Sequence, residues 1–267
     1  MKLWECINYK SGIQFLIDVP ITEYDISKAN INVLRDANAI SEEEYQYFYQ
    51  APKEERSIAI GKLQGRDPKI TEILKNGIAN ARKVFLEINR IDDSRVLEIR
   101  NDAIVVIGNP VDRLDITERV KFRDANHYTS FYSINAIEYF YFFDIVTQRE
   151  NLDAKGLGDG ATSLHLYYML EFLSELFYSA QIEGVKTAIY LLQLFHTNYI
   201  KKILDINYYR ELNSASRFRL NKGFSMTNTI YADNLTEYDK RYIDISFNES
   251  ILRYLNRIYA SIYFGTK

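Results

Sequence analysis

Apolar residues recur along this chain with two different spacings, which predict helices in some stretches and strands in others. Between Ile70 and Ile88 the apolar positions lie three or four residues apart, as on the buried face of an amphipathic helix. The opposite face of that helix is expected to be solvated and to carry Lys69, Lys75, Arg82 and Lys83.

Two later runs with the same helical spacing, at 162–179 and 185–204, predict a pair of long helices. Because the connecting segment 180–184 is short, the two helices are expected to be antiparallel. A terminal helix is predicted over 246–264. The last part of the chain is therefore expected to be mainly helical.

Short runs rich in β-branched and aromatic residues predict strands in the first part of the chain. Residues 13–19 indicate a strand, and residues 25–34 indicate a strand end that passes into a helix. A tight hairpin is predicted across 95–108, since its centre, Asn101–Asp102, is a pair of residues that tolerate left-handed backbone. A second hairpin is expected around 123–126.

The domain organisation follows from one glycine-rich segment. Residues 151–160 contain little apolar surface and precede the first long helix, so they predict a link between two regions. The expected fold class is α+β, with an antiparallel sheet and helices in 1–150 and a mainly helical region in 161–267. Within the first region a helix should begin at Ser41, because Ser41 and Glu44 form a capping-box pattern.

Composition and charge exclude several classes of protein. The 267 residues are 47% hydrophobic and 26% charged, as in ordinary globular proteins and unlike disordered chains. A net charge of −3 does not suit a polycation that binds nucleic acid through charge alone. The single cysteine, Cys6, rules out an intramolecular disulfide and a cysteine-based zinc cluster, and it favours a reducing cytoplasm. No signal peptide and no segment that spans a membrane are expected, so we predict no membrane partner.

Two aspartates are the candidate catalytic residues. Asp25 lies at the end of the predicted strand, and Asp102 lies at the tip of the predicted hairpin. A hairpin beside a strand end brings such residues together even when they are far apart in the sequence. Phosphoryl transfer with two divalent ions needs carboxylates that hold hard cations about 3.5–4 Å apart. We therefore interpret Asp25 and Asp102 as candidate metal ligands, with Mg²⁺ as the expected cofactor.

Three stretches of the sequence resemble motifs of family B DNA polymerases, over roughly residues 13–110. Residues 24–34 (Tyr-Asp-Ile-Ser-Lys-Ala-Asn-Ile-Asn-Val-Leu) are similar to the first carboxylate motif, in which an aspartate precedes a Ser-Leu-Tyr-Pro-like segment. Residues 97–106 (Leu-Glu-Ile-Arg-Asn-Asp-Ala-Ile-Val-Val) resemble the second motif, a hairpin that normally carries Asp-Thr-Asp-Ser. Residues 56–65 (Arg-Ser-Ile-Ala-Ile-Gly-Lys-Leu-Gln-Gly) are weakly similar to the lysine-rich helix that grips the incoming triphosphate.

This resemblance implies a palm-like sheet in the first region and metal-dependent nucleotidyl transfer. It implies that Asp25 and Asp102 bind Mg²⁺ and that Arg56 and Lys62 contact phosphates. The combination also suggests a phage or mobile element as the source of the chain.

Two alternatives to an enzyme stay open. The hairpin offers one carboxylate where the polymerase motif has two, which favours an inactive module that binds or inhibits a protein partner. An excess of aromatic residues, with 22 Tyr and 15 Phe, favours a structural or assembly protein.

A strip of basic and aromatic residues within 199–224 is the candidate nucleic-acid-binding surface. Bases stack on aromatic rings, and phosphates pair with Lys and Arg, so interleaved residues of both kinds suit a single strand. The alternative is a solvated helix end and loop whose tyrosines belong to the core. The residues expected to contact nucleic acid are Lys201, Lys202, Tyr208, Tyr209, Arg210, Arg217, Phe218, Arg219 and Lys222.

Overall fold

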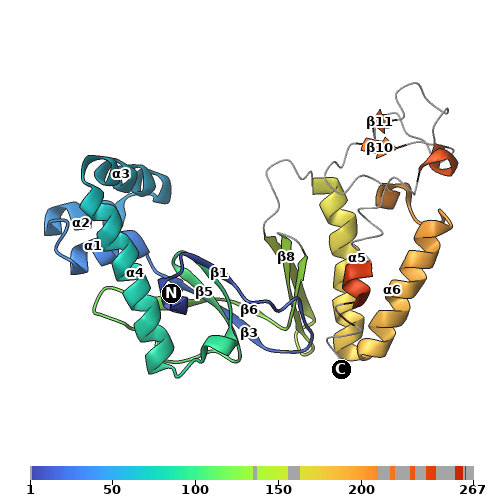
Figure 1. Ribbon diagram of the computed structural model, residues 1–267, viewed down its shortest axis with the longest axis horizontal. Coiled ribbons are helices and arrows are strands. Elements are labelled where there is room, and N and C mark those ends of the chain that lie inside the picture. The colour runs from blue at the N-terminus through green and yellow to red at the C-terminus, as the bar shows by residue number, and fades with distance from the viewer. Residues whose placement is uncertain are drawn as a thin grey trace. The chain divides into compact units, whose positions relative to one another are not determined.

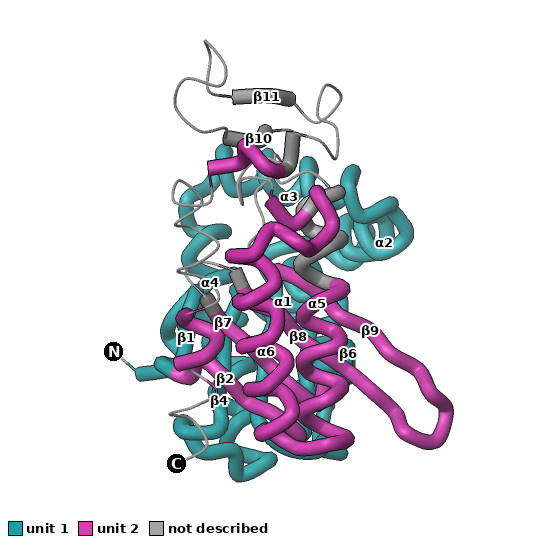
Figure 2. Tube along the Cα trace, turned by 90° about the vertical axis from the view of Figure 1, so that its right-hand side faces the viewer, with its two compact units in different colours: residues 1–12, 20–127 teal, residues 13–19, 128–267 magenta. Residues whose placement is uncertain are grey.

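The chain has the α+β fold that the sequence predicts, and it divides into two compact units. The computed structural model describes residues 2–134, 137–155, 163–209, 217–219, 229–231, 239–244, 256–260 and 262. Unit 1 comprises residues 1–12 and 20–127, and unit 2 comprises residues 13–19 and 128–267 (Figure 2). Each unit has its own hydrophobic core.

Unit 1 is built on a five-stranded sheet with the strand order β1-β4-β5-β3-β6. Figure 1 labels β1, β3, β5 and β6 of this sheet. Strand β4 pairs with β1 and β5, and β5 pairs with β3, each time antiparallel. The strands are β1 (Asn8–Lys10), β3 (Ile21–Ile26), β4 (Val96–Arg100), β5 (Ala103–Ile107) and β6 (Phe122–Tyr128).

The predicted hairpin across 95–108 is confirmed. Strands β4 and β5 are joined by Asn101 and Asp102, and Arg100 pairs with Ala103 across the turn. Asn101 has a φ of 46°, so its backbone takes the left-handed conformation that asparagine tolerates better than most residues.

Four helices complete unit 1 and form its core with the sheet. They are α1 (Ala29–Asp36), α2 (Glu42–Gln50), α3 (Lys53–Arg66) and α4 (Pro68–Ile88), and two short 3₁₀ helices, η1 (Leu3–Glu5) and η2 (Asp93–Arg95), flank them. On α4 the apolar face lies in the core as predicted, where the ring of Phe85 contacts those of Tyr24 and Phe122 at centroid distances of 4.9 and 4.3 Å. The prediction for Arg82 is wrong, because its side chain is only 2% exposed.

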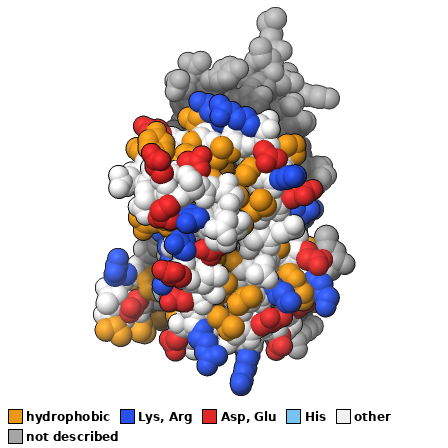
Figure 3. All heavy atoms as spheres, turned by 90° about the vertical axis from the view of Figure 1, so that its left-hand side faces the viewer, with side chains coloured by type: hydrophobic (Ala, Val, Ile, Leu, Met, Phe, Trp, Pro, Cys, Tyr) orange, Lys and Arg blue, Asp and Glu red, His pale blue; other side chains and the backbone are white. Residues whose placement is uncertain are grey.

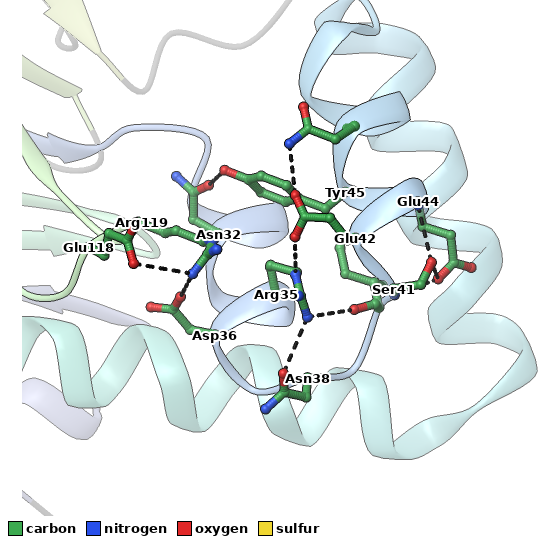
Figure 4. Close-up of polar contacts among 12 residues, drawn as sticks. Asn32, Arg35, Asp36, Asn38, Ser41, Glu42, Glu44, Tyr45, Glu118 and Arg119 are labelled. Carbon is green, nitrogen blue, oxygen red and sulfur yellow. Dashed lines mark hydrogen bonds and ion pairs between the residues drawn. The ribbon is translucent and has the colours of Figure 1, made fainter.

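The start of α2 is fixed by the predicted capping box. The hydroxyl of Ser41 accepts a hydrogen bond from the Glu44 N–H at 3.2 Å, and the Glu44 carboxylate accepts one from the Ser41 N–H at 2.8 Å. Arg35 at the end of α1 pairs with Glu42 at 2.8 Å and so ties the two helices together (Figure 4). These contacts set where the chain turns between α1 and α2.

Strand β6 replaces the hairpin expected around 123–126, which is a wrong prediction. The strand is continuous from Phe122 to Tyr128, and both end residues are buried. It lies beside β3 at the edge of the sheet, where the Asn126 amide donates a hydrogen bond to the Glu23 carboxylate at 2.9 Å. The Asp and Asn that suggested a turn are exposed on an edge strand, where polar side chains are tolerated.

Unit 2 contains a four-stranded sheet in the order β2-β7-β8-β9 and the two long helices that the sequence predicts. Its strands are β2 (Phe15–Leu16), β7 (Ser130–Ile134), β8 (Ile137–Asp144) and β9 (Arg149–Lys155), with a separate pair β10 (Arg217–Arg219) and β11 (Thr229–Tyr231). Its helices are α5 (Ser163–Ile182), α6 (Val185–Ile200), η3 (Ile206–Tyr209) and η5 (Asp239–Tyr242). The strand predicted at 13–19 is therefore confined to Phe15–Leu16. Of the predicted terminal helix, the described residues 256–260 are helical, and most of the rest lies outside the described residues.

The division between the units falls earlier than the glycine-rich segment suggests. It lies between His127 and Tyr128, and β9 occupies the first half of segment 151–160. Residues 156–160 lie outside the described residues. Strands β7 and β8 belong to unit 2 because their aromatic side chains join its core, where Tyr141 stacks on Phe177 of α5 at 5.3 Å. Strand β9 joins the same core through Leu152 and Ala154. The range 1–150 therefore spans unit 1 and most of the unit 2 sheet.

Candidate metal and nucleotide site

The structure brings Asp25 and Asp102 together at one end of the unit 1 sheet. Asp25 is the next-to-last residue of β3 and pairs with Ala103, the first residue of β5, so it lies beside the turn that carries Asp102. The N–H of Ile26 donates a hydrogen bond to the Asp102 carbonyl oxygen at 3.2 Å. The strand pairing and this hydrogen bond therefore bring the backbones of the two aspartates together.

Asp25 lies on the face of the sheet opposite the helices. Side chains alternate along a strand, and Tyr24 and Ile26 both belong to the core that α4 shares. Glu23 and Asp25 therefore project from the other face. A ligand can reach the Asp25 carboxylate, whose side chain is 26% exposed.

The surroundings of Asp102 disfavour the charged form of its carboxyl group. Burial raises its pKa above the ordinary value, and the negative charge of Asp25 raises that pKa further. Lys53 and Arg82 act in the opposite direction and lower the pKa of Asp102. Positive charge from a bound cation would offset both the desolvation of the charged Asp102 carboxylate and its repulsion by Asp25.

Arg123 of β6 pairs with Asp25 and is a site residue that the sequence analysis missed. Its Nη2 and Nε lie 2.6 and 3.2 Å from the same carboxylate oxygen, Oδ2. The arginine side chain is 64% exposed, so the pair lies at the surface. No local pattern marks Arg123 as a site residue, because the turn expected at 123–126 would have placed it outside the sheet.

Arg82 of α4 holds the hairpin turn from inside unit 1. Its guanidinium donates two hydrogen bonds to the Trp4 carbonyl, at 3.1 and 2.8 Å, and a third to the carbonyl of Asn101. The helix is thereby connected to the residue that precedes Asp102. Its burial is explained by these two carbonyl partners, which come from segments far from α4 in the sequence.

The predicted phosphate ligands Arg56 and Lys62 come from a helix and not from the strand and turn that carry the aspartates. Both lie on α3, where Arg56 donates to the Ala51 carbonyl at 3.4 Å and Lys62 is exposed. In the described part of the chain, no contact joins either residue to Asp25 or Asp102. The cation of α3 whose charge reaches Asp102 is Lys53, at the start of the helix.

The number of acidic side chains limits how many cations the site can hold. Among the described residues, no group of three or more His, Cys, Asp and Glu side chains is arranged to hold a metal ion. The nearby Glu23 is engaged by Arg100 at 3.9 Å and by Asn126, and Glu98 pairs with the same Arg100. Asp25 and Asp102 are therefore the candidate ligands for a divalent cation at this end of the sheet. Mg²⁺ is commonly held by one or two carboxylates, with waters and substrate phosphates completing its shell.

The predicted nucleic-acid strip in unit 2 is only partly described, and its described tyrosines are packed. Tyr209 is fully buried and stacks on Tyr199 at 4.9 Å, so its ring is a core residue and is not available to a base. Tyr208 is half-buried and packs on Phe195. This matches the alternative in which the tyrosines belong to the core.

The basic residues of the strip differ in their surroundings. Lys201 is exposed, whereas Lys202 donates to the Arg241 carbonyl at 2.8 Å and burial lowers its pKa. Residues 217–219 form β10, and their side chains lie outside what the structure describes. Arg210 and Lys222 lie outside the described residues.

Other surface features of unit 1 do not involve the aspartates. A cavity of about 570 Å³ lies between α1, α4 and residues 116–120, and Asn76 and Ile73 are among the residues that line it. Neither Asp25 nor Asp102 lines this cavity. On the face shown in Figure 3, acidic and basic side chains are interspersed, without a broad basic field.

Comparison with known proteins assigns the chain to a phage family. The family model described as "Bacteriophage PBS1 gene 130 protein" matches residues 1–260, so the chain belongs to this family. That assignment agrees with the phage origin that the sequence suggests. No curated protein matches the chain. Among the described helices, none combines the length and apolar character needed to cross a bilayer.

Proposed function

We propose that this member of the PBS1 gene 130 family is a palm-like protein that acts on nucleic acid by Mg²⁺-dependent nucleotidyl transfer. Asp25 and Asp102 are its metal-binding carboxylates. The single observation that carries the proposal is their convergence at the end of one sheet, from a strand and from the turn of the neighbouring hairpin. The resemblance to family B DNA polymerases implies the same juxtaposition.

The chemistry of the two carboxylates supports a cation that arrives with a nucleotide. Two carboxylates leave most of the coordination shell of Mg²⁺ to water and to phosphate oxygens. Mg²⁺, when bound, supplies positive charge at the phosphoryl group that is transferred. The protein's part is to hold Asp25 on the rigid sheet and Asp102 on a turn that the buried Arg82 fixes. Holding the backbones of both residues in place before the ligand binds lowers the conformational cost of binding.

A second function, an inactive module that binds a protein partner, is favoured by one specific contact. Arg123 pairs with Asp25 through two nitrogens and so supplies positive charge where a metal would bind. In this alternative the ion pair is permanent, and the hairpin has one carboxylate because it no longer binds a metal.

Calorimetric titration separates the two functions. Mn²⁺ and Mg²⁺ are titrated into the wild type, Asp102→Asn and a control, Asp93→Asn, with and without a nucleoside triphosphate. Asp93 is an exposed aspartate of η2, so its variant removes the same charge from another part of unit 1. We expect metal binding that the nucleotide strengthens in the wild type and control and that is lost in Asp102→Asn.

Absence of metal binding in all three proteins would refute the enzyme and leave the protein-binding module. If metal binds, primer extension with labelled nucleotide tests the transfer step itself. The same reactions at increasing salt test the nucleic-acid contact, because affinity that rests on phosphates falls steeply with salt concentration.

A further inference from the structure

We propose that Arg123 is a phosphate-binding residue that exchanges between two partners. In the free protein it pairs with Asp25, and when a divalent cation and a nucleoside triphosphate bind it pairs with a phosphate of the nucleotide. This inference rests on the proposed function and names a residue that the sequence motifs do not include. It also assigns to Arg123 part of the role that the resemblance gives to Arg56 and Lys62.

The geometry of the ion pair leaves room for such an exchange. Both contacting nitrogens of Arg123 converge on Oδ2 of Asp25, at 2.6 and 3.2 Å. The pair is therefore not the fork in which each nitrogen meets its own oxygen, the arrangement that gives arginine its strongest carboxylate contacts. A phosphate group offers several oxygens to the planar guanidinium and is the better partner for both nitrogens.

Because Arg123 is exposed, breaking its ion pair with Asp25 costs little free energy. The Arg123 side chain is 64% exposed, and ion pairs at the surface contribute little to the stability of a fold. By contrast, Arg82 is 2% exposed and bound to two backbone carbonyls, so it cannot leave its position at a comparable cost. Of these two arginines beside the aspartates, Arg123 is the one that is free to move toward a ligand.

The charges at the site explain why the exchange accompanies binding. A cation that binds Asp25 competes with the guanidinium for the same carboxylate and repels it. The triphosphate brings excess negative charge to the same place and gives the displaced guanidinium a new partner. Arg123 therefore opposes binding of the cation alone and supports binding of the cation together with the nucleotide.

This dual role predicts effects of opposite sign in a single variant. Mn²⁺ alone, and Mn²⁺ with a non-hydrolysable nucleoside triphosphate, are titrated into the wild type, Arg123→Gln, Arg123→Lys and the control Arg66→Gln. Arg66 is an exposed arginine at the end of α3. We expect Arg123→Gln to bind Mn²⁺ alone about two- to five-fold more tightly, the range expected for loss of one exposed ion pair. We expect it to bind Mn²⁺ with nucleotide about ten-fold or more weakly, since a charged hydrogen bond to phosphate is lost.

Arg123→Lys should keep part of the nucleotide effect because it keeps the charge but not the planar fork, and Arg66→Gln should match the wild type. The inference is overturned if Arg123→Gln changes both affinities in the same direction or changes neither. If the wild type binds Mn²⁺ and nucleotide and Arg123→Gln binds both with unchanged affinity, this inference alone is overturned. A wild type that binds no Mn²⁺ overturns the proposed function and this inference together.

Discussion

Replacing Arg82 with methionine tests how the hairpin turn beside Asp102 is held. Arg82 makes three hydrogen bonds to two backbone carbonyls, those of Trp4 and Asn101. Methionine fills a similar volume but leaves both carbonyls without this donor. A buried carbonyl that loses its partner costs about 1–3 kcal/mol. Methionine also removes the cost of burying a guanidinium, which offsets part of that loss. We expect Arg82→Met to lower the free energy of unfolding by about 2–4 kcal/mol.

Two measurements on the same variant separate this prediction from a general loss of stability. Urea unfolding gives the change in free energy, and hydrogen exchange of the amides in 97–106 reports on the hairpin itself. Exchange should accelerate most in the hairpin, and the affinity for Mn²⁺ should fall about ten-fold or more, as for other residues that orient a metal ligand.

The matched control is Arg66→Met, which makes the same replacement at an exposed position on α3 and should stay within about 0.5 kcal/mol of the wild type. The reasoning is refuted if Arg82→Met is as stable as the control, or if the hairpin amides exchange at the wild-type rate.

Three further predictions concern single side chains. Asp102→Asn should be more stable than the wild type at pH 7, because the raised pKa of Asp102 means that its charged form opposes folding. The gain in stability should shrink as the pH falls toward 3.8, the ordinary pKa of an aspartate. A variant that is less stable than the wild type in urea unfolding at pH 7 would contradict this prediction. Gly77→Ala should lower the free energy of unfolding by about 1–2 kcal/mol despite the better helix propensity of alanine, since the added Cβ would lie 2.3 Å from Cγ1 of Val33. Combining Gly77→Ala with Val33→Ala should recover the loss. If Gly77→Ala alone stabilised the protein, α1 and α4 would have to separate freely. Tyr209→Ala should lower the free energy of unfolding by about 3–5 kcal/mol, measured by thermal or urea unfolding, because the ring is buried against Tyr199. Weaker nucleic-acid binding at unchanged stability would show that the ring contacts bases instead.

Local patterns were enough to predict the elements that carry the two aspartates. The turn at Asn101–Asp102 was identified from two residues that tolerate left-handed backbone, and the capping box at Ser41 from two residues three positions apart. The strand that ends near Asp25 and the helix that follows it were identified in the same way. Each of these signals depends on neighbours in the sequence, so the sequence contains all that is needed.

The rest of the candidate site depends on pairing between distant segments. Arg123 contacts Asp25 only because β6 lies beside β3, and nothing near Arg123 in the sequence indicates that neighbour. Arg82 was predicted to be solvated because it lies on the helix face opposite the apolar residues. Two carbonyls from other segments nevertheless accept its hydrogen bonds inside the unit. The position of the division between the units also depends on distant pairing. A glycine-rich segment is visible locally in the sequence, whereas the pairing of β8 with β9 is not.

Anomalous scattering from crystals grown with Mn²⁺ and a non-hydrolysable nucleoside triphosphate tests the central claim most directly. The proposed function predicts one anomalous peak with an oxygen of Asp25 and an oxygen of Asp102 each within about 2.0–2.6 Å of it. In the same maps the guanidinium of Arg123 should lie on a phosphate instead of on Asp25. A Mn²⁺ peak elsewhere in the molecule, or an intact pair between Arg123 and Asp25 with no metal beside it, would contradict the account.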